Sequence, residues 1–142
     1  MSGIVIIGAG QAGSSLAIKL RTLGYEGAVT LIGEEPYAPY QRPPLSKTYL
    51  LGEMALERLY LRPEELYRDQ NIELRLAAQV TAIDPVAGVV SLGHETLAYD
   101  QLALTTGSTP RLLPEAIGGG LKNVFAVRGL ADVDAMRPAF ER

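Results

Sequence analysis

The feature that most constrains the fold is the glycine pattern "GAGQAG" at residues 8–13, which stands between a strand-like and a helix-like segment. Residues 4–7 form a short apolar run rich in β-branched side chains, typical of a strand buried on both faces of a parallel sheet. Apolar residues then recur at helical spacing until Gly24, a residue type that commonly ends helices. Residues 28–33, "AVTLIG", have the composition of a second buried strand. This order predicts one βαβ unit with a right-handed crossover.

The spacing of the three glycines is typical of a loop that binds the pyrophosphate of a dinucleotide. Gly8 would permit a tight turn, Gly10 would leave room for the pyrophosphate, and Gly13 would let the helix pack closely on the sheet. The backbone N–H groups of Gln11 and Ala12, at the start of the helix, would face the phosphates. The pattern therefore predicts dinucleotide binding, and the alternative is an ordinary glycine-rich turn.

An acidic pair, Glu34 and Glu35, follows the second predicted strand, about 20 residues after the glycines. A carboxylate in this place accepts hydrogen bonds from the ribose hydroxyls and repels a 2′-phosphate. The pair therefore favours NAD or FAD over NADP. The βαβ unit alone does not choose between NAD and FAD, because both carry the same adenosine diphosphate half.

The loop "YQRPPLSK" at residues 40–47 contains two adjacent prolines between an arginine and a lysine. Proline restricts its own backbone and that of the preceding residue, so the loop should be extended and stiff. Ser46 is a plausible N-cap for a short helix that runs through Leu51 and stops at Gly52. The alternative to a functional loop is a surface loop with two solvated cations.

The remaining chain predicts further sheet rather than another βαβ unit. A helix is expected from Pro63, with the proline at its first position, followed by a strand into Val80. Short antiparallel strands are expected over residues 82–98, with His94 in a solvated turn, and then a buried strand that ends at residues 106–107. The fold class is therefore α/β, a Rossmann-like βαβ parallel sheet with an antiparallel β-meander.

Composition excludes several classes of function. The 142 residues suffice for one domain, and the net charge of −3 does not suggest a surface for nucleic acid. The absence of cysteine removes disulfides, thiolate metal sites and redox thiol pairs from this chain, and a single histidine does not indicate a metal site. We found no basic leader and no apolar run near the roughly 18 residues of a membrane helix, so we expect a cytoplasmic protein without membrane contact.

Five segments together resemble the N-terminal part of the bacterial FAD-dependent ferredoxin reductases. These segments are "VIIGAGQAG", "LIGEEPYAPYQRPPLSK", "LYLRPEELY", "AIDPVAGVVSLGHETLAYDQLALTTGSTPR" and "VFAVRGLADVDAMR". The family comprises the putidaredoxin, rubredoxin and biphenyl-dioxygenase ferredoxin reductases, which belong to the pyridine nucleotide-disulfide oxidoreductase superfamily. "RPPLSK" is the most specific segment, whereas the glycine pattern and "TTG" occur across the superfamily.

The resemblance implies a set of FAD-binding residues. The glycine loop would hold the pyrophosphate and Glu34 the adenosine ribose, with Glu35 beside it. Pro44 would lie near the isoalloxazine and Lys47 close to the flavin, so these two residues are the catalytic candidates. A cation there would favour reduced, anionic flavin. The complete set of expected cofactor-binding residues is Gly8, Gly10, Gln11, Ala12, Gly13, Glu34, Glu35, Arg42, Lys47, Val80, Thr106, Gly107 and Arg128.

Two of these assignments have plain structural alternatives. The resemblance places the backbone of Val80 against the adenine, but Val80 could equally be a core valine. The resemblance makes Arg128 an FAD contact, whereas a solvated arginine at a helix start is the alternative.

The resemblance also implies an incomplete protein. Residues 1–110 would be the N-terminal part of an FAD-binding domain, and residues 111–142 a linker toward an NADH-binding domain that this chain lacks. The parent would pass electrons from NADH through FAD to an iron–sulfur ferredoxin.

Several alternatives to this function remain. They are a non-catalytic fragment or nucleotide-binding module, an NAD-binding regulatory module, and a flavoprotein like monodehydroascorbate reductase or apoptosis-inducing factor. Apolar surface that the missing segments would cover predicts self-association into a homo-oligomer.

Overall fold

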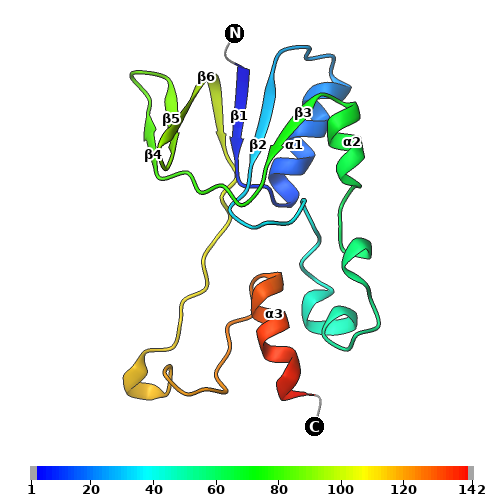
Figure 1. The fold of residues 1–142 in the computed structure, drawn as a ribbon, viewed down its shortest axis with the longest axis vertical. Helices are drawn as coiled ribbons and strands as arrows, with labels where there is room; N and C mark the ends of the chain where they lie inside the picture. Colours follow the sequence, from blue (N-terminus) through cyan, green and yellow to red (C-terminus); the bar gives the residue numbers. More distant parts are fainter. Residues whose placement is uncertain (1–2, 141–142) are drawn as a thin grey trace. The chain divides into compact units, whose positions relative to one another are not determined.

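A six-stranded mixed sheet dominates the computed structural model, which describes residues 3–140 (Figure 1). The chain divides into two units. Unit 1 comprises the residues up to Tyr40 together with Tyr60–Gly107, and unit 2 comprises Gln41–Leu59 together with the residues from Ser108 onward. The sequence-based boundary at residue 110, and the interpretation of residues 111–142 as a linker, remain predictions.

Unit 1 contains the whole sheet, with strand order β3-β2-β1-β6-β5-β4. β1 pairs in parallel with both β2 and β6, β2 pairs in parallel with β3, and β4, β5 and β6 pair antiparallel. The predicted βαβ unit and meander are therefore confirmed. The elements of unit 1 are β1 (Gly3–Ile7), α1 (Gln11–Thr22), β2 (Val29–Ile32), α2 (Glu64–Asp69), β3 (Ile72–Arg75), β4 (Ala82–Asp84), β5 (Val89–Leu92) and β6 (Glu95–Leu104).

The two faces of the parallel strands are covered differently, and each carries its own core. On one face, strand residues pack with residues of α1 and α2, which Figure 1 shows beside β2 and β3. On the other face, Val90 of β5 joins residues of β1 and β2 in a second cluster, so the meander curls over this face. The buried members of the helix-side cluster are Ile6, Ala17, Val29, Leu31, Tyr67 and Ile72, and those of the meander-side cluster are Val5, Ile7, Ile32 and Val90.

The end of α1 is fixed by glycine and by a single arginine. Gly24 has φ +83°, a left-handed conformation that glycine adopts without strain and that commonly ends helices. Arg21 donates hydrogen bonds of 2.6–2.8 Å to four backbone carbonyls, those of Tyr25, Gly27, Gln70 and Asn71. One side chain thereby joins the end of α1 to the end of α2.

Three sequence-based boundaries in unit 1 are wrong. Pro63 is the residue before α2 rather than its first residue, because its ψ of 147° is extended. β3 ends at Arg75, so no strand runs into Val80. The last strand ends at Leu104 rather than at residues 106–107, and its residues are exposed or half-buried rather than buried. β6 pairs with the meander through its first half and with β1 through its second half, which alternation in the sequence does not reveal.

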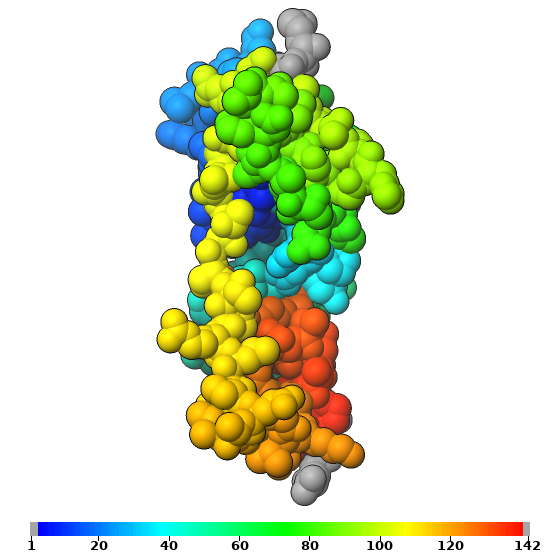
Figure 2. All heavy atoms as spheres, turned by 90° about the vertical axis from the view of Figure 1, so that its left-hand side faces the viewer, coloured from blue at the N-terminus to red at the C-terminus, as the bar shows by residue number. Residues whose placement is uncertain are grey.

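Unit 2 contains little regular structure. Its longest element is α3 (Leu130–Met136), and its buried apolar residues come largely from α3 and from the segment Leu45–Tyr49. Figure 2 shows residues 111–124, coloured amber to orange, at the surface, and five of their apolar side chains are exposed. The short helical turns of unit 2 are Leu45–Tyr49, Leu56–Arg58, Glu115–Ile117 and Arg137–Ala139, and the exposed apolar residues are Leu112, Leu113, Ile117, Leu121 and Val124.

The prediction that Ser46 caps a short helix is wrong. The residue before the helical segment is Pro44, no side-chain hydrogen bond caps the segment, and Ser46 lies inside it. Because proline fixes φ near the helical value, Pro44 enters the turn directly and makes a serine cap unnecessary.

Candidate nucleotide-binding site

The glycine loop lies where the carboxyl ends of β1 and β6 meet. Nucleotides in open parallel sheets bind outside the strand ends, at the point where consecutive strands diverge to opposite sides. In unit 1 that point lies between β1 and β6, since β2 pairs with the other edge of β1. Gly8 follows β1 directly, and Thr105 follows β6 directly.

Gly8 and Gly13 are required by close packing. Gly8 has φ +111°, and a Cβ on it would collide with the backbone carbonyl of Thr105. A Cβ on Gly13 would collide with the carbonyl oxygen of Gly8 and would lie 2.9 Å from Cδ1 of Leu31. These contacts confirm the predicted tight turn and the predicted close approach of the helix to the sheet.

Gly10 differs from both, because a Cβ on it would meet no atom within 4 Å. It precedes α1 with extended backbone (φ −98°, ψ −162°), and no side chain caps the helix. The N–H groups of Gln11, Ala12 and Gly13 therefore have no intrahelical acceptor, and the first turn carries no acidic residue. An uncapped helix start beside open space fits an anionic phosphate group.

The acidic pair after β2 lies next to the glycine loop, because a Cβ on Gly33 would lie 2.6 Å from the Cβ of Ala9. The two carboxylates differ in their surroundings. Glu34 is exposed, whereas Glu35 accepts a 2.5 Å hydrogen bond from the hydroxyl of Tyr40. Glu34 therefore fits the ribose-binding role better than Glu35.

Thr105 is a site-forming residue that the sequence analysis missed. Its hydroxyl donates to the carbonyls of Ile7 (3.1 Å) and Gly8 (2.9 Å), and its N–H donates to Ile7 at 2.8 Å. These bonds fix the glycine loop against the end of β6. The first threonine of "TTG" is the sequence signal that could have identified it. The predicted residues Thr106 and Gly107 follow as exposed loop residues, and Gly107 has φ +69°.

Val80 is half-buried in the loop between β3 and β4, where its side chain packs on the meander-side cluster. The core role that we considered for this side chain is therefore observed. The proposed contact of its backbone with an adenine remains a prediction.

The other predicted site residues lie in unit 2. Arg42 donates a 2.6 Å hydrogen bond to the backbone carbonyl of Arg128. The N–H groups of Arg128 and Gly129 donate to the carboxylate of Asp132 at 2.9 and 2.8 Å, which caps the start of α3. Lys47 is exposed, and its ammonium donates to the carbonyl of Pro43 at 3.1 Å. The helix-start position that we considered as the alternative for Arg128 is thus observed, because Arg128 lies just before the N-cap of α3. Contact of any of these residues with a cofactor remains a prediction.

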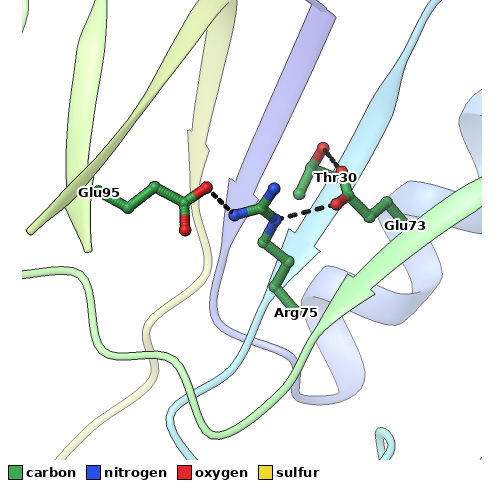
Figure 3. Close-up of polar contacts among 4 residues, drawn as sticks. All are labelled: Thr30, Glu73, Arg75 and Glu95. Carbon is green, nitrogen blue, oxygen red and sulfur yellow. Dashed lines mark hydrogen bonds and ion pairs between the residues drawn. The ribbon is translucent and has the colours of Figure 1, made fainter. Parts of the chain in front are cut away.

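A charged network on the meander-covered face of the sheet is another feature that the sequence analysis missed (Figure 3). Arg75 donates to Glu73 at 2.9 Å and to Glu95 at 2.5 Å, and the hydroxyl of Thr30 donates to Glu73 at 3.0 Å. The hydrogen bonds with Glu95 and then Glu73 raise the pKa of Arg75, so the guanidinium stays charged. The network ties β3 to the start of β6.

Neither a metal centre nor a membrane helix is present in the part of the chain that the structure describes. Residues 3–140 contain no group of three histidine, cysteine or acidic side chains that could hold a metal ion. No helix within these residues is long and apolar enough to cross a membrane.

The fold and the glycine loop define a protein of the FAD/NAD(P)-binding α/β class. A profile of the pyridine nucleotide-disulphide oxidoreductase family matches residues 2–142, and the chain belongs to this family. Ferredoxin reductases of the family use FAD and NAD(P)H.

Several of the similar proteins are ferredoxin reductases, as the sequence resemblance indicated. Rhodocoxin reductase of Rhodococcus erythropolis is 44% identical over 134 residues, which are 94% of this chain and 31% of that protein. The probable ferredoxin reductase CtmF of Castellaniella defragrans is 41% identical over 139 residues, 96% of this chain and 33% of that protein. The crystal structure of the covalent putidaredoxin reductase–putidaredoxin complex matches with a TM-score of 0.89 and 42% identity, over 97% of this chain and 34% of that chain. The chain thus spans about a third of the length of the curated relatives it matches.

Proposed function

We propose that this chain is the FAD-binding portion of an NADH-dependent flavoprotein oxidoreductase that passes electrons to an iron–sulfur ferredoxin. The observation that carries the proposal is the uncapped start of α1 beside the open space at Gly10, where β1 and β6 diverge. The similarity to rhodocoxin reductase and to putidaredoxin reductase supports the choice of FAD and of a ferredoxin partner.

The residues of unit 1 would bind and orient the nucleotide half of FAD. The N–H groups at the start of α1 would donate to the pyrophosphate, and Glu34 would accept from the ribose hydroxyls. Thr105 holds the loop in shape without needing to touch the cofactor. When bound, FAD supplies the exchange of a hydride for single electrons.

The residues Arg42, Pro44, Lys47 and Arg128 of unit 2 belong to the same proposal as the contacts for the rest of the cofactor. Pro44 would act as a rigid wall for a flat ring, because proline has little conformational freedom to lose. Lys47 would place a positive charge near the ring. Lys47 and Pro44 are therefore the two catalytic candidates.

Cell compartment and assembly are further parts of the proposal. NADH as electron donor favours the cytoplasm. The exposed apolar residues of segment 111–124 and Leu104, which is 63% exposed, favour self-association of this chain. Light scattering of the purified chain tests the latter, and a monomer at high concentration would contradict it.

The substitution Gly10→Ser tests the nucleotide site, because it should move stability and binding in opposite directions. A serine at this extended position can cap α1, which should raise the free energy of unfolding by about 0.3 kcal/mol. Its hydroxyl would take the N–H groups that the phosphate needs and would fill the open space, so the Kd for FAD should rise at least about tenfold. Flavin fluorescence quenching measures the Kd, and urea unfolding measures the stability.

Gly120→Ser is the matched control, since a Cβ there would meet one atom, Cγ of Glu115, at 3.8 Å in a loop of unit 2. It should change neither quantity. Unchanged FAD affinity in Gly10→Ser would refute the proposed site.

The second candidate function is a nucleotide-binding module without catalytic activity, because the uncapped start of α1 beside Gly10 fits the pyrophosphate of any dinucleotide. Calorimetry with each nucleotide, together with the visible absorption spectrum, separates the candidates. FAD binding with a flavin band that NADH bleaches would identify a working enzyme, FAD binding without bleaching a module, and saturation by NAD alone a nicotinamide-binding module.

A further inference from the structure

The segment from Arg42 to Tyr49, which contains Pro44 and Lys47, is hydrogen-bonded at both ends to residues in α3 or close to its two ends, within unit 2. At the first end, Arg42 donates to the carbonyl of Arg128 at 2.6 Å. At the other end, the hydroxyl of Tyr49 donates to Asp134 at 2.8 Å, and Arg137 donates to the carbonyl of Tyr49 at 2.7 Å. The segment is thus bounded by fixed points while Lys47 between them is exposed.

The backbone between these points has an unusual turn. The carbonyl of Pro44 accepts hydrogen bonds from the N–H groups of both Lys47 (3.0 Å) and Tyr49 (3.1 Å), so the turn is one residue wider than an α-helical turn. Ser46 (φ −93°, ψ 16°) and Lys47 (φ −132°, ψ −114°) leave helical geometry inside it. Because Lys47 leaves helical geometry, its side chain departs from the direction that an α-helix would give it. Wide turns of this kind are frequent at functional sites.

Tyr49 ends this wide turn and is held by three kinds of contact. Its side chain is buried, with 7% of the residue exposed. The guanidinium of Arg137 lies 4.7 Å from the centre of its ring, a cation–π distance, while the same guanidinium binds its carbonyl. Burial, followed by the hydrogen bond to Asp134, raises the pKa of the Tyr49 phenol, so it remains a donor over the physiological pH range.

Asp134 and Arg137 lie three residues apart on the chain, at the spacing that places two side chains on one face of a helix. They therefore contact Tyr49 from the same side. Asp134 binds its hydroxyl, and Arg137 contacts its ring and its carbonyl. An apolar pair would bury Tyr49 equally well but would not fix the direction of its carbonyl.

We propose that Tyr49, Asp134 and Arg137 form a clamp that sets the backbone at Lys47 and thereby directs the Lys47 ammonium. Tyr49, Asp134 and Arg137 are thus positioning residues for Lys47, which lies two residues before Tyr49 in the sequence. The inference rests on the proposed function, in which Lys47 lies close to the flavin. The clamp does not touch the cofactor and acts through Lys47.

The chemical reactivity of Lys47 tests the clamp without FAD. The chain has two other lysines, Lys19 and Lys122, which serve as internal references. Acetylation with a limiting reagent, followed by mass spectrometry, measures all three rates. Tyr49→Phe should change the rate at Lys47 by about fivefold, the factor for one lost hydrogen bond, and leave the references unchanged. Tyr25→Phe is the matched control, because Tyr25 also stacks with an arginine, Arg21 at 5.9 Å, but lies in unit 1.

A cycle of substitutions tests the same clamp with FAD as the probe. Tyr49→Phe should raise the Kd for FAD about fivefold in the native background and by less than about twofold when Lys47 is already replaced by Met. Asp134→Asn, which keeps an acceptor, should have a smaller effect than Asp134→Leu. Arg137→Lys, which keeps the charge but loses the planar fork, should resemble Tyr49→Phe.

The outcomes separate the clamp from the proposed function. An unchanged acetylation rate at Lys47 in Tyr49→Phe would overturn the clamp, whether or not FAD binds. Equal losses of FAD affinity with and without Lys47 would also overturn it, because the tyrosine would then act on the fold alone. If the native chain binds no FAD, the proposed function fails, and the acetylation rates still decide the clamp.

Discussion

Different interactions stabilise unit 1 and unit 2, each within itself. Unit 1 buries apolar residues on both faces of its parallel strands. The helices contribute residues to one cluster, and the meander contributes residues to the other. Unit 2 exposes much of its apolar surface, and its segments are joined by side-chain-to-backbone hydrogen bonds such as those of Arg42 and Arg137. Apolar packing on both faces of the sheet thus contributes most to the stability of unit 1, whereas unit 2 combines a small apolar cluster with long-range polar contacts.

The largest effect expected from this difference is on the free energy of unfolding, when a buried leucine is replaced by alanine in each unit. Leu31 in unit 1 and Leu130 in unit 2 are both fully buried. Leu31→Ala should cost about 4 kcal/mol of unfolding free energy, near the upper end of such substitutions, because the sheet around it cannot collapse into the cavity. Leu130→Ala should cost about 2 kcal/mol, because the short helix and loops around it can move inward.

Native-state hydrogen exchange of amides in β1 and in α3 measures the two costs separately. Equal losses would mean that unit 2 is as rigidly packed as unit 1, which would remove the contrast.

A buried polar pair provides a second test, this time within unit 1. The hydroxyls of Ser14 and Tyr67 lie 2.7 Å apart and are both buried, so each satisfies the other. Tyr67→Phe should cost about 1–2 kcal/mol, because the Ser14 hydroxyl would lose its partner in the core. The double variant with Ser14→Ala should be at least as stable as Tyr67→Phe alone, and urea unfolding of the three variants measures this. A double variant that sums both losses would show that the hydrogen bond itself contributes little.

Alkaline pH should weaken both units through one buried tyrosine in each. Burial raises the pKa of Tyr67 in unit 1 and of Tyr49 in unit 2 above the ordinary value of 10.0. The unfolded chain therefore releases these protons first, so the stabilisation is complete below about pH 10 and is lost as the pH rises toward the folded-state pKa values. Circular dichroism in urea, followed as pH increases, should show a smaller loss in Tyr67→Phe and in Tyr49→Phe. An unchanged pH profile in either variant would contradict the assignment for that unit.

The sequence predicted most of unit 1 and little of unit 2, and the reason is physical. The βαβ unit follows from apolar periodicity and glycine spacing within a few residues, as at Gly8 and Gly13. The clamp on Tyr49 depends on partners 85 and 88 residues away, which no local pattern reveals. The same holds for Thr105, whose hydroxyl binds carbonyls 98 and 97 residues earlier. Of the candidate site, the glycine loop and acids were predictable from spacing, whereas the contacts that shape the loop were not.

The smallest effect is expected from the charged network in Figure 3. This network lies in unit 1 and can be compared with the polar contacts that join segments of unit 2. The side chains of Arg75 and Glu95 are 27% and 58% exposed, so solvent screens their attraction. Glu95→Gln should therefore cost no more than about 0.5 kcal/mol of unfolding free energy, and the loss should shrink further in concentrated salt. Urea unfolding at low and high salt measures it, with Glu26→Gln, another exposed glutamate of unit 1, as the control. A loss several times larger that persists in salt would mean that unit 1 depends on a polar tie between β3 and β6 as unit 2 depends on its own. The contrast between apolar and polar stabilisation would then apply to the two faces of the sheet rather than to the two units.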